Sequence, residues 1–484
     1  MSQLSGNEKY SNWTKKQLIE RLLFYESNQE IPLNSTSQTY AQITSTKKLD
    51  KKNEKSISAR PLDWSKYSIR HIALKIAYFG WNYHGFASQG NEEVFPSIEG
   101  HLFKALLNTK LISDPSDCNF SKCGRTDKGV SGLGQVVTLD VRSNLPKDSP
   151  IESNELDYNE YINENIISDK SHINNEQEKI EEVPYVESLN RLLPDDIRVL
   201  AWAPVEKDFS ARFNCKSRKY KYFFVRGNLD IELMREAANR FLGTHDFRNF
   251  CKVDGSKQIT NFERTVLEVG IEPLQVKQQD NPLEFYVFNL RGTAFLWHQV
   301  RFMMSVLFLI GQKLESPSVV DSLLDITKTP AKPNYEMASE IPLVLYDCEF
   351  DNLEWQYGRD YDTVFNAPSR LYNHIYGQWY IHTTKSLVYS TLLYDLGKTS
   401  LNQLVPKNHE MKEQNSQTRL LKDFVYSNNI MNSSTKKSTS IILGGGKELR
   451  VRNYVNISNK KTCDTAKSKN EKYNAKRIKL DNNE

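Results

Sequence analysis

The residues with the clearest chemical potential lie in one short segment, Gly124-Arg-Thr-Asp-Lys-Gly129. Two glycines there flank Asp127, Arg125 and Lys128, shortly before a strand pattern that begins at Gln135. Glycine permits tight turns and the close approach of other backbone, so such a loop can present a carboxylate outside a sheet. Neighbouring cations would keep the pKa of Asp127 low, and an ionised carboxylate can act as a nucleophile. An ordinary Asp-containing turn is the alternative on these residues alone.

Two further side chains are unusual for their expected surroundings. Arg301 opens an almost wholly apolar run, Phe302 to Ile310, which predicts a buried helix. A buried guanidinium needs a carboxylate partner, and we predict an ion pair with Asp127; the alternative is a side chain that extends to solvent from the helix start. Tyr220 begins a strand pattern and can reach solvent, whereas Tyr222 and Phe224 on the same face are expected in the core.

Hydrophobic periodicity predicts the elements that would position these residues. A strand from Ile72 to Tyr78 is followed by a helix capped by Ser97 and by a strand from Gln135 to Arg142. Later in the chain the same patterns predict a strand at Arg218–Arg226, a helix at Ile231–Leu242 ended by Gly243, a strand at Glu284–Leu290, a helix at Val300–Ile310 and a strand at Leu343–Glu349. Strands therefore alternate with helices in an earlier part of the chain and again in a later part.

Composition limits the classes of protein that are possible. The chain of 484 residues is 38% hydrophobic and 26% charged, with a net charge of only +4, so composition alone does not indicate a nucleic-acid partner. The longest apolar run falls short of the ~20 residues that cross a bilayer, so no membrane partner is expected. The six cysteines are scattered without a Cys-x-x-Cys pair, which favours reduced thiols in an intracellular compartment and argues against structural zinc.

Polar stretches divide the chain into five parts. We expect an amphipathic helix in residues 1–30, a disordered linker at 31–66, a first folded half at 67–215, a second at 216–384 and a polar to basic extension at 385–484. An acidic, Asn-rich insertion at 144–183 interrupts the first half and is expected to be disordered and to lie away from any RNA-binding face. The lysine-rich tail is either a solubilising extension or a phosphate-contacting or nuclear-targeting segment.

Several ordered strings resemble a known family. The string Gly124-Arg-Thr-Asp-Lys-Gly-Val130, followed by Gln135-Val-Val, is similar to the signature of the TruA family of tRNA pseudouridine synthases. The resemblance continues in register at Ile76-Ala-Tyr-Phe-Gly80, Leu189-Asn-Arg-Leu-Leu-Pro194, Phe209-Ser-Ala-Arg-Phe213, Arg218-Lys-Tyr-Lys-Tyr222, Gly243-Thr-His-Asp-Phe247 and Phe295-Leu-Trp-His-Gln-Val-Arg301. The strings Asp246-Phe-Arg-Asn-Phe-Cys251 and Leu345-Tyr-Asp-Cys348 resemble the eukaryotic branch that modifies uridines 38 and 39 of the anticodon stem-loop.

This resemblance implies a fold and an activity. The fold would be α+β, with two ferredoxin-like (RRM-like) halves whose antiparallel sheets join around a basic catalytic cleft. The activity would be the isomerisation of uridine to pseudouridine in tRNA, with the base flipped into the site, no organic cofactor and no metal. The partners would be tRNA and a second copy of the chain in a homodimer, in the nucleus and cytoplasm.

The resemblance also implies roles for individual residues. Asp127 would be the nucleophile, attacking either C1′ of the sugar or C6 of the base, with Arg301 as its counter-ion. Tyr220 would stack on the target base, and Arg125 would occupy the space that the flipped uridine leaves, or contact a phosphate. Arg212 would face the RNA backbone, or form an ion pair within the fold.

The remaining matched positions carry weaker implications. Leu343 would pack near the target base, or simply in the core, and neither His245 nor His298 is expected to be a catalyst. A non-catalytic RNA-binding protein of the same fold is the main rival, and a methyltransferase is disfavoured because no Gly-rich nucleotide-binding turn occurs.

Overall fold

The structure is a computed structural model that describes residues 62–146, 181–274, 284–357, 370–404 and 439–481. The expected helix in residues 1–30, most of the linker and residues 147–180 of the acidic insertion lie outside the described residues. The two ends of that insertion are joined, because Ser143 donates to the Glu182 carboxylate at 2.7 Å and Arg70 pairs with the same carboxylate. The insertion therefore leaves and rejoins the fold at one place, the end of the strand that contains Ser143.

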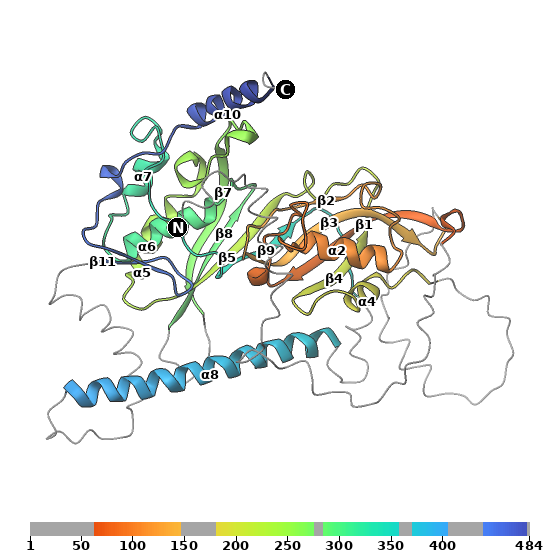
Figure 1. Cartoon of the computed structure of the whole chain (residues 1–484), viewed down its shortest axis with the longest axis horizontal. Helices are drawn as coiled ribbons and strands as arrows, with labels where there is room; N and C mark the ends of the chain where they lie inside the picture. Colours follow the sequence, from red (N-terminus) through yellow and green to blue (C-terminus); the bar gives the residue numbers. More distant parts are fainter. Residues whose placement is uncertain (1–61, 147–180, 275–283, 358–369, 405–438, 482–484) are drawn as a thin grey trace, which may run out of the picture. The chain divides into compact units, whose positions relative to one another are not determined.

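The first half has its helices packed on a small antiparallel sheet (Figure 1). Its strands pair in the order β4-β1-β3, and β2 pairs with the middle of β3, at Val137 and Thr138. The elements are β1 (Ser68–Tyr78), α2 (Ile98–Asn108), β2 (Ser121–Lys122), β3 (Ser131–Ser143), α4 (Tyr185–Asn190) and β4 (Ile197–Pro204). Ser97 caps α2 as expected, accepting a hydrogen bond from the Gly100 amide at 3.0 Å.

The second half also packs helices on an antiparallel sheet, which here has five strands. Its strands pair in the order β9-β5-β8-β7-β6. The elements are β5 (Ser217–Val225), α5 (Ile231–Asn239), β6 (Gly243–Asp246), β7 (Glu263–Pro273), β8 (Phe285–Gly292), α6 (Gln299–Gly311), α7 (Val319–Leu324) and β9 (Leu343–Glu349). Every residue of α6 is buried, as its apolar sequence predicts, and Arg301 lies in its first turn.

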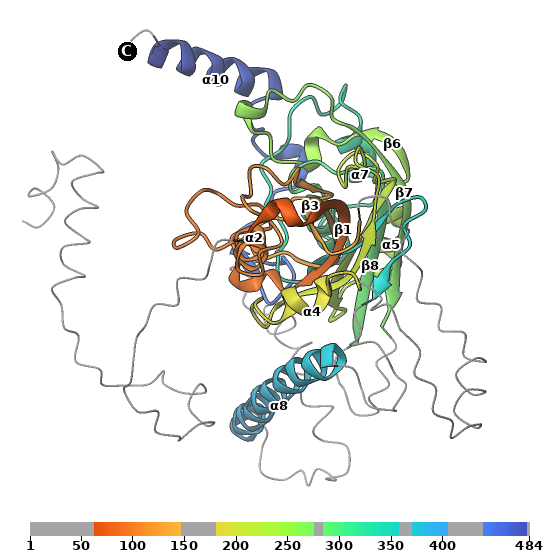
Figure 2. The same ribbon diagram turned by 90° about the vertical axis from the view of Figure 1, so that its right-hand side faces the viewer.

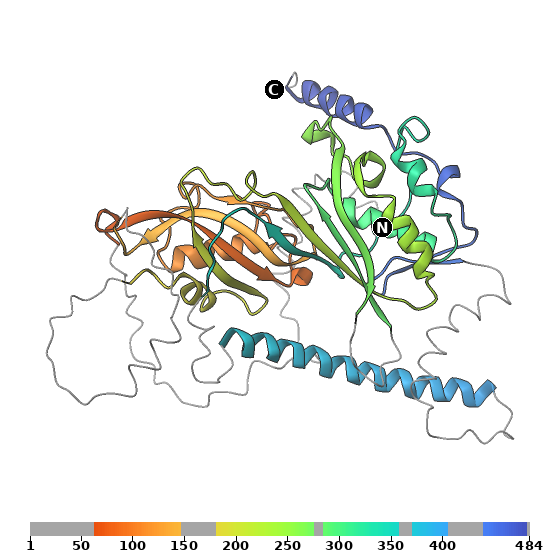
Figure 3. The same ribbon diagram turned by 180° about the vertical axis from the view of Figure 1, so that it is seen from behind.

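One continuous sheet joins the two halves (Figure 3). β3 runs parallel to β9, with Ser131 opposite Val344 and Gly132 opposite Leu345, while the other strand pairs are antiparallel. The fold is therefore α+β with a large, mostly antiparallel sheet. The Asp127 loop ends where β3 begins, so the nucleophile candidate lies at the junction of the halves.

The chain beyond the second half also contributes to its core, which the sequence did not predict. β10 (Gln356–Tyr357) lies within the expected second half but pairs with β4 of the first half. α8 (Arg370–Leu404) crosses the boundary expected at 384. β11 (Thr439–Ile442) and β12 (Glu448–Val451) form a hairpin, and the 3-10 turn η8 (Ile457–Asn459) follows. Ile441, Leu443 and Ile457 are buried in the second-half core.

The C-terminal helix completes the described chain. α10 (Ala466–Asp481) packs on the 3-10 turn η4 (Gly255–Lys257), at the end of the second half that holds β6 and β7 (Figure 2). Gly255 permits this contact, because a Cβ atom there would lie 2.5 Å from the Lys469 carbonyl oxygen. None of the helices in the described ranges is long and apolar enough to cross a membrane.

Candidate active site

The loop that carries Asp127 is fixed by hydrogen bonds at both ends. The buried Gln135 side chain accepts from the Gly124 amide at 3.1 Å and donates to the Gly124 carbonyl at 2.8 Å. Thr126 shares a 2.9 Å hydrogen bond with the buried Tyr78 hydroxyl, and the Val130 amide donates to the Asp127 carbonyl. A carboxylate on such a loop keeps its position before any substrate arrives, which favours catalysis.

Glycines allow the first strand and its following loop to lie against this segment. A Cβ atom on Gly80 would meet the Val130 carbonyl oxygen at 2.0 Å, and one on Gly85 would lie 2.8 Å from the Thr126 carbonyl oxygen. The Phe86 amide donates to that Thr126 carbonyl at 3.1 Å. Two of the strings that carried the family resemblance therefore contact each other through backbone that only glycine permits.

The carboxylate of Asp127 faces the start of α6 in the second half. The Trp297 indole N–H donates to Asp127 Oδ1 at 3.0 Å, and His298 Nε2 lies 3.5 Å from Asp127 Oδ2. His298 has a left-handed backbone with φ of 65°, a strained conformation for a residue other than glycine, and it caps α6 in that state. Sequence patterns do not connect Trp297 or His298 with Asp127, because neither side chain forms a known catalytic pattern with a distant carboxylate.

Burial controls the ionisation of Asp127, contrary to the expectation from its sequence neighbours. Burial raises the pKa of Asp127 to about 6, while the Arg301 guanidinium, the Trp297 N–H and Lys252 favour the charged form. Arg125 and Lys128 are exposed, so solvent screens them and they do not lower this pKa. At pH 7 the carboxylate is still mostly ionised, and it is more basic than an exposed Asp.

His298 does not supply a compensating charge. Burial, with Arg301 and Lys252 nearby, lowers the pKa of His298 to about 4, so its imidazole is neutral at pH 7. Its Nδ1 has no hydrogen-bond partner among the described residues. The contact with Asp127 is therefore between a carboxylate and a neutral ring.

The predicted ion pair between Arg301 and Asp127 is wrong in this structure. Arg301 instead pairs with Glu340 at 2.5 Å and donates through Nε to the Ala338 carbonyl at 2.8 Å. Its side chain is only 7% exposed, so the argument that it needs a carboxylate holds, but Glu340 from the segment before β9 is the partner. Arg301 still acts on Asp127 through its charge.

Tyr220 lies on β5 within reach of the same carboxylate. Its ring meets the edge of Phe295 with centroids 5.1 Å apart. Burial raises the pKa of Tyr220 well above its ordinary value, and the negative charge of Asp127 adds to this effect. Tyr222 and Phe224 are buried in the core, as predicted, so Tyr220 is the member of this stripe that remains beside the loop.

The three other predicted site residues differ in their exposure. Arg125 is exposed and forms no hydrogen bond or ion pair with the described residues. Arg212 is also exposed, with its guanidinium over the Phe213 ring at 5.4 Å, and no ion pair holds it within the described fold. Leu343 is buried in the second-half core at the start of β9, the position that its core-packing alternative predicts.

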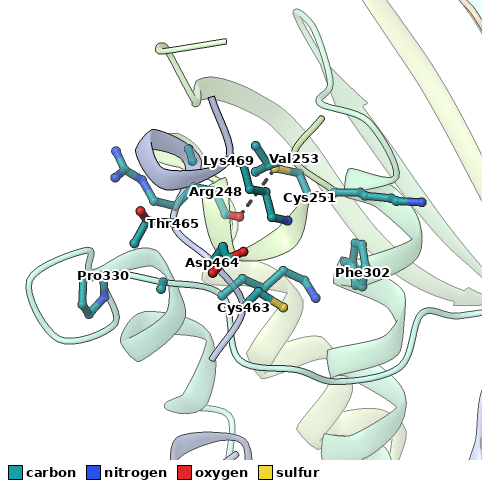
Figure 4. Close-up of a pocket in the computed structure, with 13 residues that line it drawn as sticks. Arg248, Cys251, Val253, Phe302, Pro330, Cys463, Asp464, Thr465 and Lys469 are labelled. Atoms are coloured by element: carbon teal, nitrogen blue, oxygen red, sulfur yellow. Dashed lines mark hydrogen bonds between the residues drawn. The ribbon is translucent and has the colours of Figure 1, made fainter. Parts of the chain in front are cut away.

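Figure 4 shows a basic pocket in the second half, and Lys252 is one of the residues that line it. The Lys252 ammonium lies 4.7 Å from the Trp297 ring centroid, and Trp297 contacts Asp127. Cys463, Asp464 and Thr465 of the C-terminal segment face Arg248, Cys251 and Phe302 across the pocket. This segment is held by the Cys463 amide, which donates to the Lys332 carbonyl at 2.8 Å.

The pocket carries an excess of positive charge. Arg248, Lys252, Lys332 and Lys469 line it, against the single carboxylate of Asp464. Lys332 lies 3.9 Å from the Phe302 ring centroid, and burial lowers its pKa to about 8, so it is largely charged at pH 7. Because Arg248 is already paired with Asp246 at 2.7 Å, an anionic ligand would face chiefly the ammonium groups of Lys252, Lys332 and Lys469.

The comparisons with known proteins agree with one another. The family model described as tRNA pseudouridine synthase matches residues 237–351. The chain is 46% identical over 346 residues to "tRNA pseudouridine(38/39) synthase" of Bos taurus, covering 71% of this chain and 67% of that protein. It is 44% identical over 356 residues to the protein of the same name in Saccharomyces cerevisiae, covering 72% and 73%. The human protein of that name is 46% identical over 339 residues, covering 69% of this chain and 65% of its own length.

Proposed function

The chain belongs to the tRNA pseudouridine synthase family, and we propose that it converts uridine to pseudouridine in the anticodon stem-loop of tRNA, at positions 38 and 39. The observation that carries the proposal is the Asp127 carboxylate, which lies on a hydrogen-bonded loop and forms no ion pair with a Lys or Arg of the described residues. The names of the bovine, human and yeast relatives support the positions. Arg125 lies on the Asp127 loop and Tyr220 lies on β5, and both support the binding of a flipped base.

The mechanism begins with attack by ionised Asp127 on C1′ of the sugar or C6 of the uracil. The bond between N1 and C1′ breaks, the uracil rotates, and C5 bonds to C1′. The bond to Asp127 then breaks, by displacement if it was formed at C1′ or by elimination if it was formed at C6, and the carboxylate is regenerated while C5 loses its proton and N1 gains one. Atoms balance without a second substrate, since the reaction is an isomerisation. The residues that touch Asp127 are Trp297 and His298, which leaves the open side of the carboxylate for the nucleotide.

Binding of tRNA would rest on phosphate contacts and base flipping. Flipping costs a few kcal/mol, and contacts to the stem-loop must offset that cost. Arg125 and Arg212 are exposed and unpaired within the described fold, and the basic pocket offers Lys252, Lys332 and Lys469. We therefore expect tRNA affinity to fall steeply with salt and to fall further in a Lys332→Ala, Lys469→Ala double variant.

The finer fold proposal is that each half is ferredoxin-like. Support comes from the order of elements: the first half runs strand, helix, two strands, helix, strand, and the second half follows the same order with one additional strand, β6, and one additional helix, α7. The strand orders β4-β1-β3-β2 and β9-β5-β8-β7 are equivalent position by position. The basic cleft of the family would lie where β3 meets β9, beside Asp127.

Two proposals concern the state of the protein in the cell. We propose a homodimer, supported by apolar side chains that α8 leaves exposed, among them Tyr376, Trp379, Leu387 and Leu392. Light scattering after gel filtration tests it, and a monomeric mass at micromolar concentration would contradict it. A location in nucleus and cytoplasm is supported by the lysines of α10, and imaging of a tagged chain with these lysines replaced tests it.

The activity is tested by mapping pseudouridine in tRNA transcripts incubated with wild-type protein or with Asp127→Ala. The proposal expects pseudouridine at positions 38 and 39 from the wild type and none from the variant. Asp347→Ala is a matched control, because this carboxylate pairs with Lys75 on β1. Equal modification by wild type and Asp127→Ala, or tRNA binding without any modification by the wild type, would contradict the proposal and favour a non-catalytic RNA-binding protein.

A further inference from the structure

Three cysteine thiols that the proposed reaction does not use lie together at the junction of the two halves. Cys123 follows β2, Cys215 precedes β5 and Cys348 lies in β9. Their Sγ atoms all lie within 4.8 Å of one another, and each residue is at most 8% exposed. Within the described residues this is the single group of three or more potential ligands with such spacing.

Packing and a disulfide are the simpler explanations for such a cluster. Free thiols are often buried as small apolar groups, and these three do belong to a small hydrophobic cluster with Val136 and Leu345. A disulfide would join only two of the three sulfurs, and all three cysteines are free in the structure. Neither explanation accounts for the convergence of three soft donors from three separate segments onto one point.

The geometry fits a metal ion with small shifts. Some point lies within about 2.8 Å of three atoms that are no more than 4.8 Å apart, whereas a Zn–S bond is about 2.3 Å, so movements of roughly half an ångström would complete the site. Such movements are within the reach of side-chain rotation. Thiolates are the ligands that select zinc and other soft ions over magnesium or calcium.

A neighbouring cation fits the charge of such a site. Three thiolates and one Zn²⁺ leave a net charge of −1, which is costly to bury without a partner. The Arg218 guanidinium contacts the backbone of two of the cysteines, with Nη1 3.4 Å from the Cys215 oxygen and Nη2 3.3 Å from the Cys123 oxygen. The other charged groups beside these cysteines are already paired, Lys122 with Glu99 and Lys216 with Asp351.

We propose that Cys123, Cys215 and Cys348 bind one thiophilic metal ion, Zn²⁺. The ion would be structural. Cys123 lies four residues before Asp127, and Cys215 and Cys348 flank β5, which carries Tyr220. Binding would therefore hold the nucleophile loop of the first half against the strands of the second half.

The first experiment measures metal in the full-length protein. Protein purified without chelator, or refilled with Zn²⁺ and desalted, is expected to hold about one zinc per chain. Co²⁺ in place of zinc should give the intense near-ultraviolet absorption of thiolate-to-cobalt charge transfer. Because the thiols must lose their protons to bind zinc as thiolates, zinc affinity should rise with pH.

Variants separate this site from adventitious binding. Each of Cys123→Ser, Cys215→Ser and Cys348→Ser should weaken zinc binding by at least ~10-fold, judged by competition with a chromophoric chelator. Cys118→Ser is the matched control, since Cys118 is equally buried but lies alone in the first-half core, and it should bind zinc like the wild type.

A measurement on the wild type covers the case in which the variants fail to fold. Alkylation followed by mass spectrometry should find the three thiols protected in zinc-loaded protein and modified after chelation, while Cys118 stays unchanged. Wild-type protein that binds no zinc or cobalt, equal zinc binding in a triple serine variant, or a disulfide between two of the three cysteines would overturn the proposal. None of these readouts depends on pseudouridine formation.

Discussion

Two carboxylates from different halves of the molecule lie near the same arginine and have opposite roles. Glu340, in the segment before β9, forms the ion pair with Arg301. Asp127, on the loop before β3, accepts a side-chain hydrogen bond from Trp297 alone among the described residues, and it lies beside the neutral His298. Arg301 is therefore paired with Glu340, while its positive charge also favours the ionised form of Asp127. At pH 7 the nucleophile of this site is therefore mostly charged but not held in an ion pair, so it is available to react.

The largest expected effect separates the two carboxylates by activity. Asp127→Asn should lower pseudouridine formation by at least ~10³-fold, because the amide is not a nucleophile. Glu340→Gln should lower pseudouridine formation far less, because Asp127 is unchanged and Arg301, without its partner, can approach Asp127. Single-turnover rates on one tRNA transcript measure both. Comparable losses in the two variants would mean that Asp127 has no special role.

Removal of the shared arginine should affect both stability and activity. Arg301→Gln leaves Glu340 without its counter-ion and the Ala338 carbonyl without its donor, so we expect a loss of roughly 2–4 kcal/mol in the free energy of unfolding. The pKa of Asp127 should also rise, since the charge of Arg301 now lowers it. Urea unfolding and a pH-rate profile measure the two effects, and unchanged stability would contradict the ion pair.

Removal of the Asp127 charge should raise the free energy of unfolding, whereas removal of the Arg301 charge should lower it. Burial raises the pKa of Asp127 in the folded state to about 6, so the fold favours the protonated form and its ionisation opposes folding. Asp127→Asn should therefore stabilise the protein by up to roughly 2–3 kcal/mol above pH 6, and this gain should disappear as the pH falls towards about 4. Urea unfolding at pH 8 and pH 4 checks this. A variant less stable than the wild type at pH 8 would show that the carboxylate is well solvated or paired.

The smallest effect concerns the indole donor. Trp297→Phe removes the hydrogen bond that favours ionised Asp127, so the acidic limb of the activity profile should move to higher pH by up to about one unit. The substitution also removes the contact between Lys252 and the indole. The fold and the affinity for tRNA should otherwise change little. A limb that stays in place would assign the control of this pKa to burial and Arg301 alone.

The sequence predicted the elements better than the contacts between them. Local patterns placed the strand that became β1, the Ser97-capped helix and the apolar helix around Phe302, because periodicity and capping are properties of adjacent residues. The glycine-flanked string also identified Asp127. The identity of Arg301's partner could not be predicted, since Glu340 is brought to it only by the tertiary fold.

The same limit explains the other differences. Exposed cations beside Asp127 in sequence suggested a low pKa, whereas the folded environment buries the carboxylate and raises it. Ile441 and Leu443 lie in a short strand region within a polar stretch, so their burial in the second-half core had no periodic signal. The spacing of the cysteines likewise could not reveal that Cys123, Cys215 and Cys348 meet.

The pH dependence of kcat/KM for pseudouridine formation tests the central claim most directly. This parameter reports ionisations of the free protein, in which Asp127 should titrate near pH 6. We expect the rate to be about tenfold lower at pH 5 than at pH 7, with the fold shown intact by circular dichroism at both values. A rate that stays constant down to pH 4.5 would contradict a buried, unpaired Asp127 as the nucleophile.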